Sequence, residues 1–165
     1  MKFKFFFLLG LFLILMPKTH SYQESLEISD CVIIFYNGNI PGVAYMTIRQ
    51  KEQQADCLRA VRLAEPAPES RVEMHDHVSD FSQGSEIKKM IQLSKIDIPT
   101  DGSPVRFEPG GKHLMLYYVP DAFKRCPTLS LILTFEKAGE KLVLFSIQPA
   151  GGAGKNSKNV SCCCE

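Results

Sequence analysis

From Leu26 onward the sequence consists of short apolar or alternating runs, and no long run has the 3.6-residue spacing of an amphipathic helix. Turn-forming residues separate the runs at Asn37-Gly38, Pro66 to Glu69, Thr100-Asp101-Gly102, Pro109-Gly110-Gly111 and Lys137-Ala138-Gly139. Nine expected strands with turns about every ten residues favour an all-β sandwich or small barrel of Greek-key type over a sheet of βαβ units.

The expected strands are short and rich in β-branched, aromatic and other apolar residues. They cover Cys31–Tyr36, Ala44–Arg49, Cys57–Leu63, Arg71–His77, Met90–Ile98, Val105–Phe107, His113–Tyr118, Thr128–Glu136 and Lys141–Ile147. One helical turn is expected within Asp121–Cys126.

The N-terminus has the layout of a secretory signal peptide, because Lys2 and Lys4 precede an apolar run that ends before Pro17. Twelve apolar residues span about 18 Å as a helix, too short for a bilayer core of roughly 30 Å. We therefore expect a signal peptide at residues 1–21, one β-domain at 22–148 and a flexible, polar tail at 149–165. No cysteine follows the run closely enough to form a lipoprotein cleavage box.

Removal of residues 1–21 takes away three lysines and leaves 16 basic and 18 acidic side chains, a net charge of −2. This balance does not favour binding of nucleic acid or anionic lipid.

Among the six cysteines there is no CxxC pair, which argues against a thioredoxin-like motif or a zinc ribbon. Cys31 and Cys57 could form a disulfide in an oxidising compartment. The alternative is that Cys31, Cys57 and Cys126 are three half-buried free thiols.

Histidine and methionine are the informative residues, because beyond residue 21 the chain has only three histidines and four methionines. Six of these seven fall in three clusters: Met74-His75-Asp76-His77, Met90 and His113-Leu114-Met115. Side chains two apart in a strand share a face about 6.6–7 Å apart, so His113 and Met115 can reach one metal while Leu114, Leu116 and Tyr118 face the other way. By the same parity His75 and His77 share a face with Glu73, whereas Met74 points into the core with Val72.

Thioether sulfur is a soft ligand that zinc and iron sites seldom use, so two imidazoles with two thioethers predict a Cu(I) site. The candidate ligands are His75, Met90, His113 and Met115, placed at the rim beside the Pro109-Gly110-Gly111 turn. The alternative is a β-sandwich interaction module in which methionines are core filler and histidines are solvated surface residues.

These residues resemble the PCu(A)C-type periplasmic copper chaperones (the DUF461 family). The pattern of that family is a His, a Met some ten residues later and a His-x-Met about twenty-two residues after that; here twenty-two residues separate Met90 from His113. The similar segments are Ala44–Arg49, Val72–His75, Ile96–Pro99, Phe107–Met115 and Leu131–Glu140.

The resemblance implies a cupredoxin-like β-sandwich that binds Cu(I) through His75, Met90, His113 and Met115. It also implies a monomeric periplasmic protein that delivers copper to the CuA subunit of cytochrome c oxidase or to another copper-transfer protein. An exported copper buffer or resistance protein would show the same residues. No nucleophile, base and oxyanion arrangement is recognisable, so catalysis is not expected, although the tail thiols keep a thiol-disulfide reductase as an alternative.

The sequence departs from the family pattern in three respects. Fourteen residues separate His75 from Met90, which lengthens the Asp80–Glu86 connection and leaves His77 as a replacement for His75. Asp76-His77-Val78 also stands where the family has a second Met near the first His. At the tail, Cys162, Cys163 and Cys164 are either an additional Cu(I)-capturing element or an oxidisable end without a dedicated role.

Overall fold

A computed structural model describes residues 25–37, 40–81 and 86–150, which form ten β-strands and one short helix. The elements are β1 (Leu26–Phe35), β2 (Gly42–Gln50), β3 (Asp56–Leu63), β4 (Arg71–Asp80), β5 (Ile87–Leu93), β6 (Ile96–Ile98), β7 (Val105–Phe107), β8 (His113–Tyr117), α1 (Asp121–Lys124), β9 (Thr128–Phe135) and β10 (Gly139–Pro149). Within the described ranges, no helix is long and apolar enough to cross a membrane.

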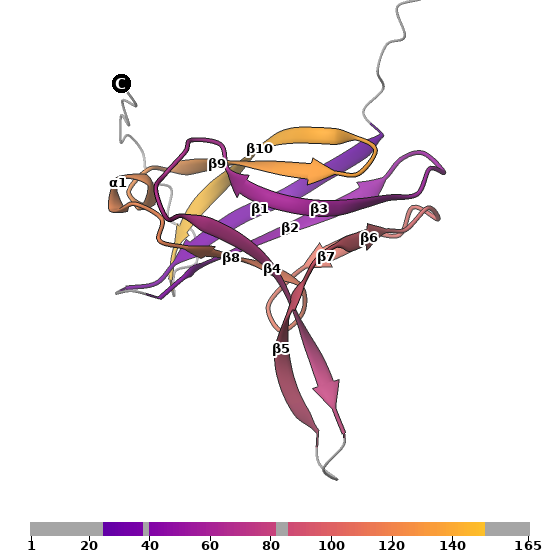
Figure 1. Ribbon diagram of the computed structural model, residues 1–165, viewed down its shortest axis with the longest axis horizontal. Coiled ribbons are helices and arrows are strands. Elements are labelled where there is room, and N and C mark those ends of the chain that lie inside the picture. The colour runs from indigo at the N-terminus through magenta and orange to yellow at the C-terminus, as the bar shows by residue number, and fades with distance from the viewer. Residues whose placement is uncertain (1–24, 38–39, 82–85, 151–165) are drawn as a thin grey trace, which may run out of the picture.

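The strands hydrogen-bond in the order β5-β4-β8-β2-β1-β10-β9-β3-β6, and β7 pairs separately with β2. Most neighbours in this order are not consecutive in the chain, which requires crossovers from one part of the sheet to another. The sheet folds over: in Figure 1 β9 and most of β10 run along the upper side of the body and β8 along its lower side, with β1, β2 and β3 between them in the view. The predicted all-β, cupredoxin-like sandwich is confirmed.

The core lies between the two folded halves, because alternate residues of the central strands point inward. In β2 the inward series is Gly42, Ala44, Met46, Ile48 and Gln50, and the intervening side chains are more exposed. The fully buried large side chains come from both halves and include Ile33, Met46, Ile48, Leu58, Leu114, Leu116, Leu131, Leu133 and Phe145. Alternation with a period of two is the signal that made these strands recognisable in the sequence.

One expected strand is wrong, because Met90–Ile98 forms two strands with different partners. β5 pairs with β4, whereas β6 pairs with β3 through Leu58 and Ile96. The chain bends between Leu93 and Ile96 to pass from one region of the sheet to the other. Periodicity reports which residues are extended but not which strand they pair with.

Two further expectations concern the disulfide and the two terminal segments. Cys31, Cys57 and Cys126 are all free thiols, so the Cys31–Cys57 disulfide is not formed. The expected signal peptide lies outside the described residues, as do all but the first two residues of the expected tail. Pro149 still belongs to β10 and pairs with Phe35.

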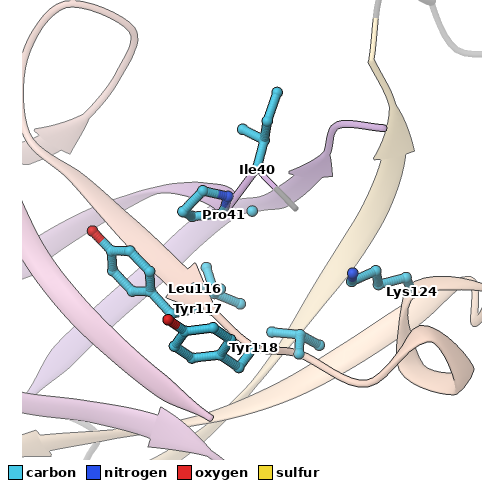
Figure 2. Close-up of a pocket in the computed structure, with 8 residues that line it drawn as sticks. Ile40, Pro41, Leu116, Tyr117, Tyr118 and Lys124 are labelled. Carbon is cyan, nitrogen blue, oxygen red and sulfur yellow. The ribbon is translucent and has the colours of Figure 1, made fainter. Parts of the chain in front are cut away.

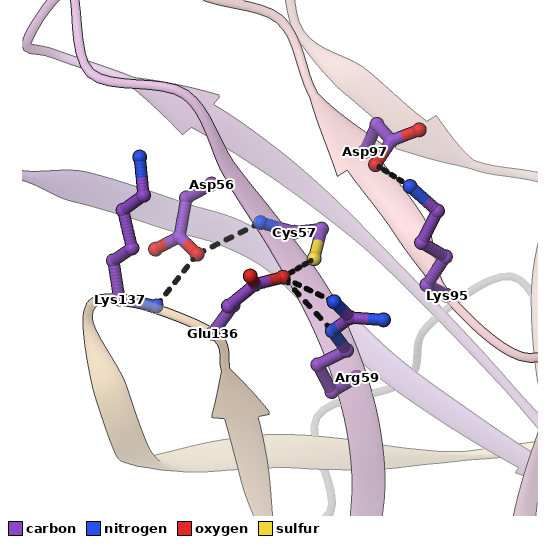
Figure 3. A network of polar contacts seen from close by, with 7 residues as sticks. All are labelled: Asp56, Cys57, Arg59, Lys95, Asp97, Glu136 and Lys137. Atoms are coloured by element: carbon purple, nitrogen blue, oxygen red, sulfur yellow. Dashed lines mark hydrogen bonds and ion pairs between the residues drawn. The ribbon is translucent and has the colours of Figure 1, made fainter.

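A buried carboxylate ties the β9–β10 turn to β3 (Figure 3). Asp56 is 8% exposed, and its Oδ1 accepts hydrogen bonds from the backbone N–H groups of Cys57 at 2.8 Å and Lys137 at 2.9 Å. Its Oδ2 accepts a third from the Ala138 N–H at 3.0 Å. Next to it, Glu136 accepts hydrogen bonds from the Cys57 thiol and the Arg59 guanidinium. Burial, followed by the bond to Glu136, raises the pKa of the Cys57 thiol, which keeps this sulfur protonated.

We predict that Asp56→Ala lowers the free energy of unfolding by about 2–3 kcal/mol, because buried N–H groups of the turn lose a charged acceptor. Urea unfolding monitored by circular dichroism measures the change. The matched control is Asp97→Ala, which removes a carboxylate with a 72% exposed side chain paired with Lys95 and should change stability by less than about 1 kcal/mol. Equal effects of the two variants would contradict the role assigned to Asp56.

Candidate metal-binding site

The candidate site lies at the root of a hairpin that leaves the sandwich. β4 pairs with β8 only from Arg71 to His75, and from Asp76 onward it pairs with β5 alone. In Figure 1 the β4–β5 hairpin therefore projects away from the body of the protein. His75 pairs with His113 on one side and with Gln92 on the other, so it stands where three strands meet.

The pairing register brings all the predicted ligands onto one face of β5, β4 and β8. Residues directly opposite each other in an antiparallel pair project from the same side of the sheet. The cross-strand pairs are Glu73 with Met115, His75 with His113 and His77 with Met90. Met90 is thus the direct neighbour of His77 and only a diagonal neighbour of His75.

Three imidazoles stack at the centre of this face. The ring of His113 lies 5.8 Å from that of His75 and 5.1 Å from that of His77, measured between centroids. His75 and His113 are 6% and 5% exposed, whereas His77 is half-buried. Burial lowers the pKa of His113 from its usual value, and the neighbouring His77 and His75 lower it further, which favours the neutral ring that can bind a metal.

A backbone carbonyl orients two of the rings. Gly111 O accepts a hydrogen bond from His113 Nδ1 at 2.9 Å and lies 3.4 Å from His77 Nδ1. A carbonyl oxygen only accepts, so a ring that donates from Nδ1 keeps the lone pair on Nε2 for a metal. The turn that presents this carbonyl contains Gly110 at φ +81°, a conformation that suits glycine.

A carboxylate orients the third ring. Glu73 Oε2 accepts a hydrogen bond from His75 Nε2 at 3.0 Å, and Arg71 Nε donates to Glu73 Oε1 at 2.8 Å. Arg71, and then His75, lower the pKa of Glu73, so the carboxylate stays ionised and acts only as an acceptor. The other ring nitrogen, His75 Nδ1, is buried and has no hydrogen-bond partner among the described residues. An orphaned nitrogen of this kind is free to bind a metal.

The two thioethers lie at opposite ends of this cluster and differ in exposure. Met115 is half-buried, and its Sδ lies 3.5 Å from Tyr117 Oη, which donates to it. Met90 is 48% exposed on the projecting hairpin. Within the described residues, no group of three or more His, Cys, Asp or Glu side chains is arranged as it stands to hold a metal ion, so a site here requires the methionine sulfurs or a rotation of the rings.

A pocket of about 600 Å³ opens further along β8 (Figure 2). Leu116, Tyr117 and Tyr118 line one side of it, and Ile40 and Lys124 lie across from them. Tyr118 is 66% exposed with φ +52°, so the expectation that it shares a face with Leu114 and Leu116, which are buried, is wrong. The strand ends at Tyr117, and a left-handed residue cannot continue its alternation.

Other sequence expectations about this region agree with the structure. Met74 is 5% exposed and belongs to the core, as its parity predicts. Those residues between His75 and Met90 that the structure describes lie in the β4–β5 hairpin, as expected. Glu73 and Gly111 are supporting residues whose contacts the sequence did not reveal, although strand parity and the glycine turn already placed both nearby.

Comparison with solved structures identifies the fold. The PCuAC domain of PmoF2 matches in a copper-bound form with 22% identity and a TM-score of 0.57, over 76% of this chain and 93% of that domain. Its apo form matches with 20% identity and a TM-score of 0.55, over 78% and 93%. The apo PCuAC domain of PmoF1 matches with 19% identity and a TM-score of 0.52, over 76% and 94%.

Comparison with protein families is consistent with this result. No protein among the curated ones matches the chain. The family model described as LpqE-like, a lipoprotein family, matches residues 26–147, which reach from the first strand to the last. Because this match covers most of the chain, the protein belongs to the LpqE-like family, and the similarity to PCu(A)C-type proteins found in its sequence is confirmed.

Proposed function

We propose that this protein is an exported copper carrier that binds Cu(I) through His75, Met90, His113 and Met115 and passes it to a partner protein. The observation that carries the proposal is the register of β5, β4 and β8, which gathers residues distant in sequence onto one face. Structural similarity to a copper-bound PCuAC domain supports it.

The donor atoms fit Cu(I) better than the other common metals. Thioether sulfur is soft and neutral imidazole tolerates several metals, so their combination favours reduced copper over zinc, magnesium or calcium. His113 and His75 each donate one ring N–H, to Gly111 O and to Glu73 respectively, which leaves the lone pair on the other ring nitrogen free for a metal. Thioethers also cannot cross-link to a disulfide, which suits an exported protein.

The arrangement suits a carrier, which must hold copper and still release it. His75 and His113 are buried, whereas Met90 is about half exposed at the root of the projecting hairpin. A partner can therefore reach the metal from the Met90 side and replace the weak thioether ligands one at a time. Release of copper in this way is ligand exchange and breaks no covalent bond.

The proposal also includes export of the protein and an acceptor for its copper, and both rest on the family resemblance. The N-terminal segment has the pattern of a signal peptide, which supports export, and the family resemblance implies that the compartment is the periplasm. The acceptor is then the CuA subunit of cytochrome c oxidase or another copper-transfer protein. A copper buffer would bind the same ion without handing it on, so mixing the copper-loaded protein with the apo CuA domain distinguishes the two.

The first test is a Cu(I) titration against a chromogenic chelator, using the chain from Tyr22 with Cys162, Cys163 and Cys164 replaced by Ser. These replacements remove the tail thiolates, which would bind Cu(I) themselves. We predict that this protein withholds one equivalent of Cu(I) and that His113→Gln/Met115→Leu binds it on the order of a hundredfold more weakly. Both substitutions roughly conserve side-chain volume, and urea unfolding verifies that the variant folds.

The matched control is Met74→Leu, which removes a thioether from the same strand as His75 but on its core-facing side. This variant should retain copper as the parent does. If the double variant also withholds one equivalent, the proposed ligands are wrong. If the parent fails to compete with the chelator, the interaction-module interpretation replaces the carrier.

We further predict that Glu73→Gln weakens Cu(I) binding about tenfold while leaving the urea midpoint nearly unchanged, because a neutral amide orients His75 less firmly. The same titration measures the loss. Glu140→Gln, which removes an exposed carboxylate paired with Arg62, is the control and should have no effect. Unchanged copper retention in Glu73→Gln would show that the carboxylate does not position His75.

A further inference from the structure

His77 lies within the candidate site but has no part in the proposed Cu(I) ligand set. It is the direct cross-strand neighbour of Met90, and its ring is the nearer of the two that stack on His113, at 5.1 Å. Its Nδ1 lies 3.4 Å from the same Gly111 carbonyl that orients His113. The register and the turn thus place a third imidazole beside the other two.

The spacing of the rings permits them to share an ion. Imidazole nitrogen binds first-row metals at about 2 Å, which leaves the ring centres of two ligands on one ion on the order of 5 Å apart. The observed separations of 5.1 Å and 5.8 Å are of this size. The rings are now roughly parallel, at 26° in each stacked pair, and among the described residues no group of three such side chains is arranged to hold an ion, so binding requires rotation of the rings.

Three imidazoles form a different kind of site from two imidazoles with two thioethers. Nitrogen and oxygen donors favour Cu(II), whereas thioether sulfur favours Cu(I). The nitrogens available to an ion are His75 Nδ1, which has no partner among the described residues, and the Nε2 atoms of His77 and His113. Met90 lies opposite His77 and Met115 lies opposite Glu73, so neither methionine stands between the three rings.

We infer that His77 gives the protein a second, overlapping donor set, made of the three imidazoles of His75, His77 and His113, which binds Cu(II). This inference rests on the proposed copper site and extends it to the second oxidation state. The protein binds either ion by exchanging ligands and transfers no electron. Copper supplied as Cu(II) in an oxidising compartment can then be bound at the same face.

The test compares the parent protein with His77→Phe, both with the tail cysteines replaced by Ser. Phenylalanine keeps an aromatic ring beside His113 and removes both nitrogens. We expect Cu(II) affinity, measured by competition with glycine, to fall at least tenfold, while Cu(I) retention changes less than about threefold. Pulsed EPR of the Cu(II) forms should count three imidazoles in the parent and two in His77→Phe.

The outcomes separate this inference from the proposed function. If the parent retains Cu(I) but binds no Cu(II), or if His77→Phe binds Cu(II) as the parent does, the second donor set does not exist. If His77→Phe loses Cu(I) and Cu(II) equally, His77 is an ordinary ligand of one site and the division into two sets is wrong. Failure of the parent to retain Cu(I) would instead overturn the carrier itself. His113→Phe, the matched aromatic variant, should lose both ions.

Discussion

The arrangement of the candidate site depends on how β4 is hydrogen-bonded. Only Met74 and His75 have partners on both sides of β4, in β8 and in β5. This double pairing buries Met74 in the core and His75 in the opposite face, and it fixes which residues of the neighbouring strands stand beside them. A shift of one residue in the register would send both histidines of β4 to the core side and Met74 to the site.

The fold class, and the side of the sheet on which most side chains lie, could be predicted from the sequence. Alternation in β2 and β9, and glycine- or proline-containing turns between strands, identified the elements because both signals are local. The same local rule predicts that Met74 and His75 face opposite sides of the sheet, and that Leu114 and His113 do so too. Tyr118 is the exception, because the strand ends one residue before it.

What the sequence could not provide is the choice of strand partners, which is not local. The Met90–Ile98 run looked like one strand because no glycine or proline interrupts it, although its two parts pair with β4 and β3. For the same reason the spacing alone did not decide between His75 and His77. The register places His77 opposite Met90 and His75 opposite His113, so both histidines lie on one face beside other candidate ligands.

Burial also differs among the proposed ligands, and the difference gives the order in which they would leave the ion. The histidines at the junction of three strands are held by a carbonyl and a carboxylate, and removing His75 from a metal would leave its buried Nδ1 without a partner among the described residues. Met90 has about half its side chain in solvent and sits on a strand paired only with β4. A thioether in this position loses little when it leaves the ion, so exchange with a partner would begin at Met90 and end at the buried imidazoles.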